Sequence, residues 1–475
     1  MTSTVNAVIG VLIGYMKRKL QEAGSHKSPA VGYSRHKQVF STEQEKQLMD
    51  SLNTASDMNC GLSHKEVRKI AFQCAVQFNC TYPESWKTSE MAGKDWMTSF
   101  LKRHPTLSIK KPQATSLAGA SSVNEGNQKP KHVRGGQGTT HHVNYIQLAL
   151  IFVVPQVSAD AVTLQLLREA RETVRRSPLG VINTPMIPWC QTTLPLSISC
   201  NIHLKLENMQ RTGSFKIRGV ANQFARRERG GHFVTMSAGN YGKSFAYASK
   251  HYGSKGKVVM PETAPISRSI LIQSFGVEVE RMPTSCLMNV VNRCVQQENM
   301  TFLHSYNDLD LIAGHASVGM EVLEVVPEPD VVVVGCGGGG LLAGVAAAIK
   351  LSGCSRTRIY GVEPEGACTM YRSFIEKRPV GMDTKSIASG LAPPFAGTLT
   401  YELCQHYVEE VVLVSDEEIR AAVGSLYGSD LVVEPSGAAA FAAIANKIPD
   451  LEGRSAVCIL SGGNIGRDEL INFPG

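Results

Sequence analysis

The sequence predicts an α/β fold with parallel sheets, preceded by a small all-α module. From about residue 160, short β-branched and apolar runs alternate with helix-like segments, a pattern typical of parallel sheets with helices on both faces. Upstream, residues 39–113 have helical patterning, and the stretch that follows is rich in Ser, Gly, Gln and His, as linkers are. We therefore expect a disordered basic lead-in over residues 1–38, a helical domain over 39–113, a linker over 114–157 and an α/β domain over 158–475.

The helical module is predicted from its helix starts. Ser41 followed three residues later by Gln44 matches a capping box, and a second helix is expected after Ser63. A third helix is expected over residues 90–103. Three short helices of this kind are enough for a small all-α domain.

The α/β region has one clear helix and several clear strands. The segment LREARETVRRS is expected to form a charged amphipathic helix, and the runs HFVTM, KVVM, VEVERM, VVVVG and AVCIL are expected to form strands. In folds of this class, binding sites lie beyond the carboxyl ends of the strands. The turns after these strands are therefore the candidate positions for chemistry.

Charge and cysteine usage limit the classes of partner. Residues 1–150 hold 19 Lys and Arg against 10 Asp and Glu, whereas the rest holds 29 against 31, so the net charge of +7 belongs to the N-terminal third. A basic module suggests a polyanionic partner. The 12 cysteines have neither C-x-x-C pairs nor Cys/His ligand spacing, which favours free thiols over disulfides or zinc. No run reaches the roughly 18 apolar residues of a membrane span, so no membrane partner is expected.

Two segments of the α/β domain offer an amine and a polar turn. In LKLENMQRTGSFKIRG, Lys216 lies near a strand-to-helix transition. A lysine held there in a desolvated position could bond a carbonyl cofactor, although on its own the segment fits a surface lysine better. The strand HFVTM is followed by Ser237, Ala238, Gly239, Asn240 and Tyr241. Small residues at a strand end expose backbone N–H groups that suit a substrate carboxylate.

A third segment, VVVVGCGGGGLLAG, runs from a buried strand through a glycine-rich turn into a helix. Bare glycine amides and the positive end of the helix dipole together form a phosphate site. Gly335, Gly337 and Gly340 also satisfy the dinucleotide fingerprint, with Glu363 near the ribose-binding position. A nicotinamide enzyme is therefore the competing interpretation. Against it, the strand lies well inside the folded region, and four consecutive glycines exceed what a pyrophosphate turn requires.

A fourth segment, SGGN, begins at Ser461 after the strand AVCIL, where a hydroxyl can hydrogen-bond a ring nitrogen. In this order and spacing, SFKIRG, SAGN, GGGG and SGGN resemble the fold-type II pyridoxal-phosphate (PLP) enzymes, specifically their serine/threonine dehydratase and serine racemase branch. The resemblance covers residues 158–471. It implies a tryptophan synthase β-like fold with two parallel-sheet α/β subdomains, the smaller one, about residues 235–300, inserted in the larger.

The resemblance also implies a role for each segment. Lys216 would bind PLP as a Schiff base, with Phe215 packed against the ring. Asn240 would bond the 3′-oxygen and Ser461 the pyridine nitrogen, so that Lys216 and Ser461 are the expected catalytic residues. The phosphate would be bound by Gly337, Gly338, Gly339, Gly340 and Leu341. Because a serine hydroxyl does not keep the ring nitrogen protonated as a carboxylate would, prompt β-elimination is favoured.

Two features decide between the activities of this branch. Racemisation needs a second acid or base on the opposite face of the substrate α-carbon, and the position that resembles this residue in racemases holds Ala238. The segment HSYND, residues 304–308, resembles the dehydratase pattern, which has an aromatic residue where racemases have Asn. We therefore expect deamination of L-serine or L-threonine to a 2-oxo acid and ammonia, with serine racemase as the alternative.

The divalent-cation site of this family is matched only in part. Glu363 and the backbone carbonyl of Ala367 fit its pattern, but Thr369 stands where an aspartate is expected. Mg²⁺ and Ca²⁺ prefer several oxygen ligands with enough negative charge. The ligand set for Mg²⁺ or Ca²⁺ is therefore incomplete, and the sequence disfavours cation binding at Glu363 and Ala367.

The N-terminal module has a resemblance of its own. Residues 39–119, notably MAGKDWMTSFLKRHPTLSIKKPQATSLAGAS, resemble the helix-turn-helix DNA-binding domain of CENP-B and pogo-like transposases. The resemblance implies phosphate contacts from Lys94, Lys102, Arg103, Lys110 and Lys111. The alternatives are a basic helical domain without a nucleic-acid role and a DNA-binding protein whose enzyme-like half is inactive. We expect a homodimer in the cytoplasm, or in the nucleus if the module is functional.

Overall fold

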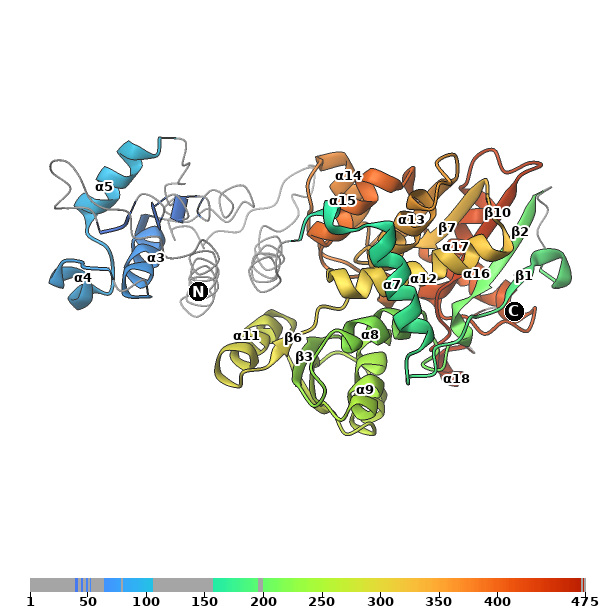
Figure 1. The fold of residues 1–475 in the computed structure, drawn as a ribbon, viewed down its shortest axis with the longest axis horizontal. Helices are drawn as coiled ribbons and strands as arrows, with labels where there is room; N and C mark the ends of the chain where they lie inside the picture. Colours follow the sequence, from blue (N-terminus) through green and yellow to red (C-terminus); the bar gives the residue numbers. More distant parts are fainter. Residues whose placement is uncertain are drawn as a thin grey trace, which may run out of the picture. The chain divides into compact units, whose positions relative to one another are not determined.

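The computed structural model describes residues 39–41, 44, 45, 48, 49, 52, 64–77, 80–105, 157–194, 200–470 and 473. The chain divides into two compact units, Met1–Val153 and Val154–Gly475 (Figure 1). The predicted lead-in over residues 1–38, almost all of the predicted linker, and both Lys110 and Lys111 lie outside the described residues. Among the described residues, no helix is long and apolar enough to cross a membrane.

The described residues of the first unit include the helices α3 (His64–Gln77), α4 (Glu84–Ser89) and α5 (Lys94–Arg103). Upstream of them, the predicted capping box is confirmed, because Ser41 N donates to Gln44 Oε1 at 2.8 Å and Gln44 N donates to Ser41 Oγ at 3.2 Å. The helix expected after Ser63 is also confirmed by α3. A core that includes Trp86 and Phe100 lies among these elements.

The helix expected over residues 90–103 is wrong at its start. Glu90 ends α4 in the left-handed conformation, with φ of 50°, and its N–H donates to the Trp86 carbonyl. Helix α5 begins only at Lys94, after Gly93. Glu90, Met91 and Ala92 have good helix propensity, but tertiary context overrides it, and Gly93 has poor propensity. The helix-turn-helix assignment of this unit stays a prediction.

The second unit is built on a six-stranded sheet. Its strands, in spatial order, are β1 (Met186–Pro188), β2 (Asn201–Leu206), β10 (Ser455–Leu460), β7 (Val331–Gly335), β8 (Arg358–Pro364) and β9 (Glu410–Val414). All neighbouring pairs are parallel except β1 with β2. In β7, Val331 and Val333 face one core and Val332 and Val334 face the other. Burial on both faces explains why this strand reads as an unbroken run of valine.

Helices cover both faces of this sheet. The core on one face contains residues of α7 (Leu164–Arg175), α12 (Leu309–Val325), α13 (Gly340–Leu351) and α15 (Thr398–Tyr407). The core on the other face contains residues of α16 (Asp416–Tyr427) and α17 (Pro435–Asn446). Two shorter helices, α14 (Thr369–Glu376) and α18 (Arg467–Leu470), follow β8 and β10. The result is a three-layer α/β arrangement (Figure 1).

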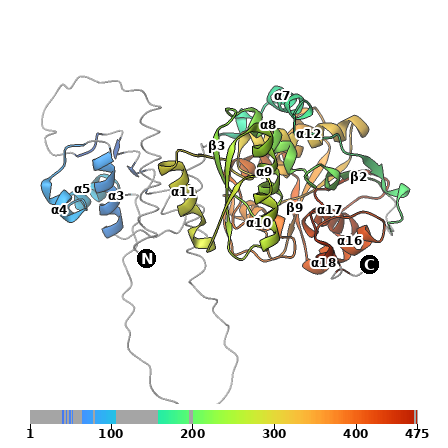
Figure 2. The ribbon, with the colours of Figure 1, turned by 90° about the horizontal axis from the view of Figure 1, so that it is seen from below.

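A second, four-stranded sheet is formed by the chain between β2 and β7. Its order is β5 (Glu278–Met282), β4 (Lys255–Pro261), β3 (His232–Met236) and β6 (Thr301–Phe302), with all pairs parallel. Its helices are α8 (Lys216–Ala225), α9 (Asn240–Tyr252), α10 (Ile266–Gln273) and α11 (Leu287–Gln297). Helices α9 and α10 lie side by side (Figure 2). The predicted α/β fold with parallel-sheet subdomains is thus confirmed, while the predicted domain boundaries stay a prediction.

Helix α8 approaches α12 closely through two glycines. A Cβ atom on Gly314 would lie 2.6 Å from the Arg218 carbonyl oxygen and 2.7 Å from the Gly219 Cα. A Cβ on Gly219 would lie 2.4 Å from His315 Nε2. Only glycine allows this approach. The contact fixes α8, which begins at Lys216, against the α12 layer of the large sheet.

Candidate active site

Lys216 is the first residue of α8. Its Nζ donates a hydrogen bond to the backbone oxygen of Ser305 at 2.8 Å and lies 5.0 Å from the ring centroid of Phe215 and 5.8 Å from that of Tyr241. Burial lowers the pKa of Lys216 from 10.5 to about 7. A large fraction of this amine is therefore neutral near pH 7, the form in which it is a nucleophile or a base.

The carbonyl that receives this hydrogen bond belongs to a tightly held turn. His304 Nδ1 accepts the N–H groups of Tyr306 at 3.2 Å and of Asn307 at 3.0 Å, so in the neutral ring the proton is on Nε2. Burial and the neighbouring Lys216 charge lower the pKa of His304 to about 3. The Tyr306 hydroxyl donates to the Phe395 carbonyl at 3.2 Å. The acceptor for Lys216 is thus fixed in place by a neutral imidazole.

The glycine-rich turn lies between β7 and α13, with Gly339 at φ of 90° as the residue before the helix. Within the described chain, the backbone N–H groups from Gly337 to Leu341 donate to no protein acceptor, although most of these residues are buried. A Cβ on Gly338 would lie 2.2 Å from the Tyr306 ring, and one on Gly337 would lie 2.8 Å from the Gly390 carbonyl. Unpaired, buried N–H groups at a helix N-terminus form a site for an anion such as phosphate.

The turn after β3 presents fewer free N–H groups than its sequence suggests. Ser237 Oγ accepts from the N–H of Gly239 at 3.3 Å and of Gly242 at 3.1 Å. Among the described residues, the N–H groups of Ala238, Asn240 and Tyr241 donate to no protein acceptor. The last two belong to the first turn of α9, where the helix dipole favours a carboxylate.

Ser461 follows β10 and lies next to the loop that carries Lys216. Its backbone oxygen accepts from Phe215 N at 3.1 Å, and Ser214 forms an isolated bridge with Gly462. Among the described residues, the Ser461 hydroxyl has one contact, a long one of 3.5 Å to the Ser436 carbonyl. Ser214 Oγ is buried and has no partner in the described part of the chain. Both hydroxyls therefore retain hydrogen-bonding capacity for a bound molecule.

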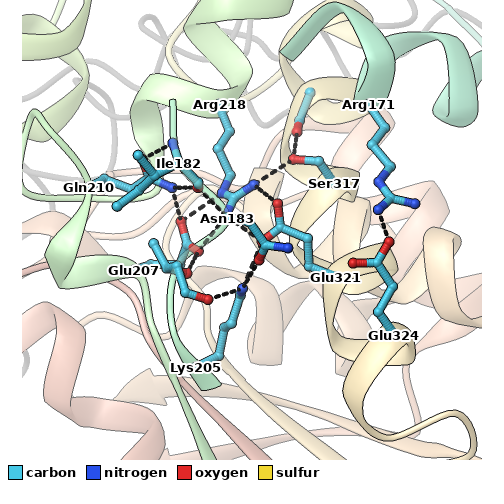
Figure 3. Close-up of polar contacts among 12 residues, drawn as sticks. Arg171, Ile182, Asn183, Lys205, Glu207, Gln210, Arg218, Ser317, Glu321 and Glu324 are labelled. Carbon is cyan, nitrogen blue, oxygen red and sulfur yellow. Dashed lines mark hydrogen bonds and ion pairs between the residues drawn. The ribbon is translucent and has the colours of Figure 1, made fainter. Parts of the chain in front are cut away.

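Arg218, two residues after Lys216, belongs to a buried ion cluster (Figure 3). Its Nε lies 2.8 Å from Glu207 and its Nη2 lies 2.7 Å from Glu321, and Lys205 Nζ lies 2.6 Å from the same Glu321 carboxylate. Two cations match two carboxylates, so no charge is left unpaired. The cluster joins β2, the 3₁₀ turn Glu207–Met209, α8 and α12, and so holds the start of α8 in place.

Glu363 is buried at the end of β8, and its carboxylate caps a helix. Oε1 accepts from Met370 N at 2.9 Å and Oε2 accepts from Tyr371 N at 2.8 Å, both in α14. Burial raises the pKa of Glu363 to about 8, although the two hydrogen bonds lower it. No group of three or more His, Cys, Asp or Glu side chains among the described residues could hold a metal ion. The incomplete cation site of Glu363 and Ala367 stays a prediction.

The structure places some of the predicted site residues close together, whereas Glu363 lies apart at the start of α14. Hydrogen bonds connect the loop of Lys216 to Ser461, and Asn240 to Glu434. Glu434 and the Glu207–Arg218 cluster were missed because charged side chains in helix-like patterns resemble solvated surface. In the first unit, Lys94, Lys102 and Arg103 are exposed on α5, and Arg103 pairs with Glu45 at 2.7 Å.

These features fit PLP. The cofactor has an aldehyde, a phosphate, a phenolic oxygen and a ring nitrogen. The site supplies a half-neutral amine at Lys216, a turn of unpaired N–H groups in which a Cβ would collide with neighbouring residues, and hydroxyls with free capacity at Ser214 and Ser461. No acidic side chain is needed to complete this set.

Comparison with known proteins supports the same cofactor. The L-threonine ammonia-lyase of Thermotoga maritima is 35% identical over 311 residues, 64% of this chain and 76% of the relative. The catabolic L-threonine dehydratase TdcB of Escherichia coli K12 is 36% identical over 285 residues, 58% of this chain and 86% of the relative.

Two solved structures have the same fold. Maize serine racemase has a TM-score of 0.60 at 30% identity and matches 66% of this chain and 96% of its own. The processed form of threonine deaminase isoform 2 from Solanum lycopersicum has a TM-score of 0.58 at 28% identity and matches 65% of this chain and 92% of its own. A deaminase and a racemase are thus about equally similar in fold.

The family model described as "Pyridoxal-phosphate dependent enzyme" matches residues 178–462, which include every predicted site residue of the α/β domain. The predicted cofactor, PLP, is thereby confirmed, and a nicotinamide enzyme is excluded. The chain belongs to the pyridoxal-phosphate dependent enzymes.

Proposed function

We propose that this enzyme deaminates L-serine or L-threonine by β-elimination of water, producing a 2-oxo acid and ammonia. The observation that carries the proposal is the buried Lys216 amine, with a pKa lowered by burial to about 7, in the same site as an anion-binding glycine turn. Relatives named as threonine ammonia-lyase and threonine dehydratase support the reaction class.

The residues that would hold PLP follow from the geometry. Lys216 would bond the aldehyde carbon, the N–H groups from Gly337 to Leu341 would bind the phosphate, Asn240 would donate to the 3′-oxygen, and Ser461 would face the ring nitrogen. Bound PLP supplies an electron-accepting ring that stabilises negative charge at the substrate α-carbon. Phe215 contacts His315, with ring centroids 4.8 Å apart, and would pack beside the PLP ring.

The protein groups then act on the substrate. The free N–H groups of Ala238, Asn240 and Tyr241 bind its carboxylate. Nζ of Lys216, freed from the aldehyde carbon when the substrate amine takes its place, would donate one hydrogen to Ser305, which orients the nitrogen, and its lone pair would take the proton from the substrate α-carbon. Ala238 has only a methyl group and supplies no proton to the opposite face, which favours elimination over racemisation.

The test uses the full chain with PLP and either L-serine or L-threonine, and measures 2-oxo acid. We expect product with at least one of them. K216A should lower the rate by about 10²–10⁴-fold, the usual worth of a general base. K250A, which removes an exposed lysine of α9, should not. Equal rates for wild type and K216A, or no oxo acid from either substrate, would exclude the proposal.

For the first unit we propose DNA binding, favoured by the exposed Lys94 and Lys102 on α5. Phosphate contacts release counterions, so the affinity for a DNA duplex should fall steeply as salt rises. Fluorescence anisotropy with a labelled duplex measures this, and K94A/K102A should reduce the slope. No binding at low salt would leave a basic helical domain without this role. A homodimer in the cytoplasm, or in the nucleus if DNA is bound, is part of the same proposal, and sedimentation tests the dimer.

A further inference from the structure

Four side chains form a continuous line of hydrogen bonds across the site. Lys243 Nζ donates to Asn464 Oδ1 at 2.6 Å, Asn464 Nδ2 donates to Asn240 Oδ1 at 2.7 Å, and Asn240 Nδ2 donates to Glu434 Oε1 at 2.5 Å. Lys243 and Asn240 belong to α9, next to the four-stranded sheet. Asn464 follows β10 of the six-stranded sheet, and Glu434 directly precedes α17, which packs on that sheet. The line therefore connects the two sheets at the site.

The chemistry at its two ends determines the direction of every hydrogen bond. An ammonium group only donates, and an ionised carboxylate only accepts. Lys243 therefore requires the oxygen of Asn464 to face it, and Glu434 requires the nitrogen of Asn240 to face it. An amide that could otherwise be turned by 180° has one allowed orientation. Either end is sufficient to impose it on the whole line.

In the described part of the chain, the Glu434 carboxylate makes no other hydrogen bond, such as a helix cap. Glu434 is the residue before α17, where an acidic side chain can cap the helix, but it makes no capping hydrogen bond. A Cβ on Gly462 would lie 2.2 Å from Glu434 Oε1 and 3.2 Å from Asn240 Nδ2. The glycine next to Ser461 thus leaves the space in which the carboxylate reaches Asn240.

The charges of Lys243 and Glu434, at the two ends of the line, each stabilise the ionised form of the other. Burial disfavours both, raising the pKa of Glu434 and lowering the pKa of Lys243. The charge of each opposes this effect on the other, and Arg268 also favours the ionised form of Glu434. Asn464 Nδ2 makes a second hydrogen bond, to the Thr212 carbonyl at 2.8 Å, in the loop before Lys216. The line is therefore anchored at its middle as well as at its ends.

We propose that Asn464 and Glu434 are positioning residues that fix the amide of Asn240 as a hydrogen-bond donor toward the 3′-oxygen of PLP, an inference that rests on the role of Asn240 in the proposed function. Asn464 is itself oriented by Lys243 and by the Thr212 carbonyl. Glu434 takes one of the two N–H groups of Asn240, so a single N–H is left to offer. A reversed amide would present its carbonyl oxygen beside Glu434 and toward an oxygen of the cofactor, which is repulsive.

The test is a double-mutant cycle on the dissociation constant of PLP, measured with the full chain in the absence of substrate. Because Asn464 on one side and Glu434 on the other each impose the orientation of Asn240, N464A and E434Q should each weaken binding by about threefold or less, the scale of one net hydrogen bond. N464A/E434Q should weaken it by more than about 20-fold, beyond the product of the two. In E434Q/K243M the Thr212 carbonyl still orients Asn464, so this double variant should match the product of its single effects.

Controls keep the outcomes distinct. Lys250 lies on α9, as Lys243 does, and is exposed. The control E434Q/K250M should therefore weaken PLP binding by the product of its two single effects. If N464A/E434Q loses its far-UV circular dichroism, N464L/E434Q repeats the cycle, because leucine fills the space of Asn464 without a hydrogen bond to Asn240. A product-like or smaller effect in the cycle of Asn464 and Glu434 overturns the positioning role. Absence of PLP binding by wild type would instead overturn the proposed function.

Discussion

The Nζ atom of Lys216 donates to the Ser305 carbonyl and lies near the rings of Phe215 and Tyr241. Burial is the cause of its lowered pKa. A carboxylate partner would raise that pKa again and keep the amine protonated. The site thus uses a neutral carbonyl and aromatic walls to obtain a lysine that is basic without being permanently charged.

This origin of the pKa predicts how the PLP-free protein takes up its cofactor. Only the neutral amine bonds an aldehyde, so the rate of covalent PLP capture should rise with pH up to about 7, the pKa of Lys216, and be level above it. An ordinary lysine, with a pKa of about 10.4, would make the rate rise across the whole range. Mixing PLP-free protein with PLP between pH 6 and 9 and following absorbance measures this. A rate still rising at pH 9 would contradict the account.

Ala238 determines whether a second proton transfer is available. It lies one residue after Ser237 and is half-buried. Wild type should produce 2-oxo acid from L-serine with no detectable D-serine, because a methyl group carries no proton. A238S adds a hydroxyl at this position and should produce measurable D-serine. Chiral chromatography of the reaction mixture decides, and D-serine from wild type at a rate comparable to oxo acid would show that another residue protonates that face.

At the scale of elements, the turn between β7 and α13 depends on backbone conformation. Gly339 has φ of 90°, and a Cβ there would lie 2.6 Å from Met370 and 2.9 Å from Thr400. Gly353, at the other end of α13, has φ of 100° and no atom within 4 Å of such a Cβ. An L-residue would be strained at both positions because of the positive φ. Only at Gly339 would its Cβ also meet neighbouring atoms, and only Gly339 lies in the turn between β7 and α13.

This pair gives a matched prediction. G339A and G353A should both lose stability, by about 1 kcal/mol or more, since an L-residue is strained at positive φ. Only G339A should lose PLP affinity, by more than about tenfold, because its Cβ forces the phosphate-binding turn to move. Thermal unfolding and PLP titration measure the two effects separately. Equal loss of PLP affinity in both variants would show that the turn has no special role.

Elements also show what the sequence could and could not predict. The run VVVVG was expected as a buried strand and is β7, because burial on both faces leaves a pattern visible in one dimension. The break before Lys94 was not predicted, because Glu90 ends α4 in the left-handed conformation, which its residue type does not indicate. Glu434 contacts Asn240 because the two residues, distant in sequence, lie beside different sheets that adjoin at the site. No local sequence pattern predicts such a contact.

At the scale of the whole molecule, the chain separates into a basic N-terminal part and a nearly neutral enzyme. The site residues of the enzyme and the family match over residues 178–462 lie within the unit Val154–Gly475. The large buried cores on both faces of the six-stranded sheet also belong to that unit. The residues to which the proposed chemistry assigns a role all belong to the second unit.

This division predicts that the N-terminal unit is dispensable for catalysis. A chain that begins at Val154 should keep kcat/KM for L-serine or L-threonine within about twofold of the full chain, because surface changes remote from a site usually have small effects. The same chain should lose any DNA binding. Steady-state kinetics and anisotropy on both proteins measure this. A large fall in kcat/KM with unchanged PLP content would show that the first unit contributes to the site.

The most direct test of the central claim, that Lys216 is the covalent attachment point of PLP, is borohydride reduction of the PLP-loaded protein followed by proteolysis and mass spectrometry. Reduction makes the bond between lysine and cofactor permanent. We predict a single phosphopyridoxyl group, on the peptide that contains SFKIRG, and loss of deaminase activity in proportion to its formation. A label on any other lysine, or full deaminase activity in a protein whose Lys216 carries the label, would contradict the account.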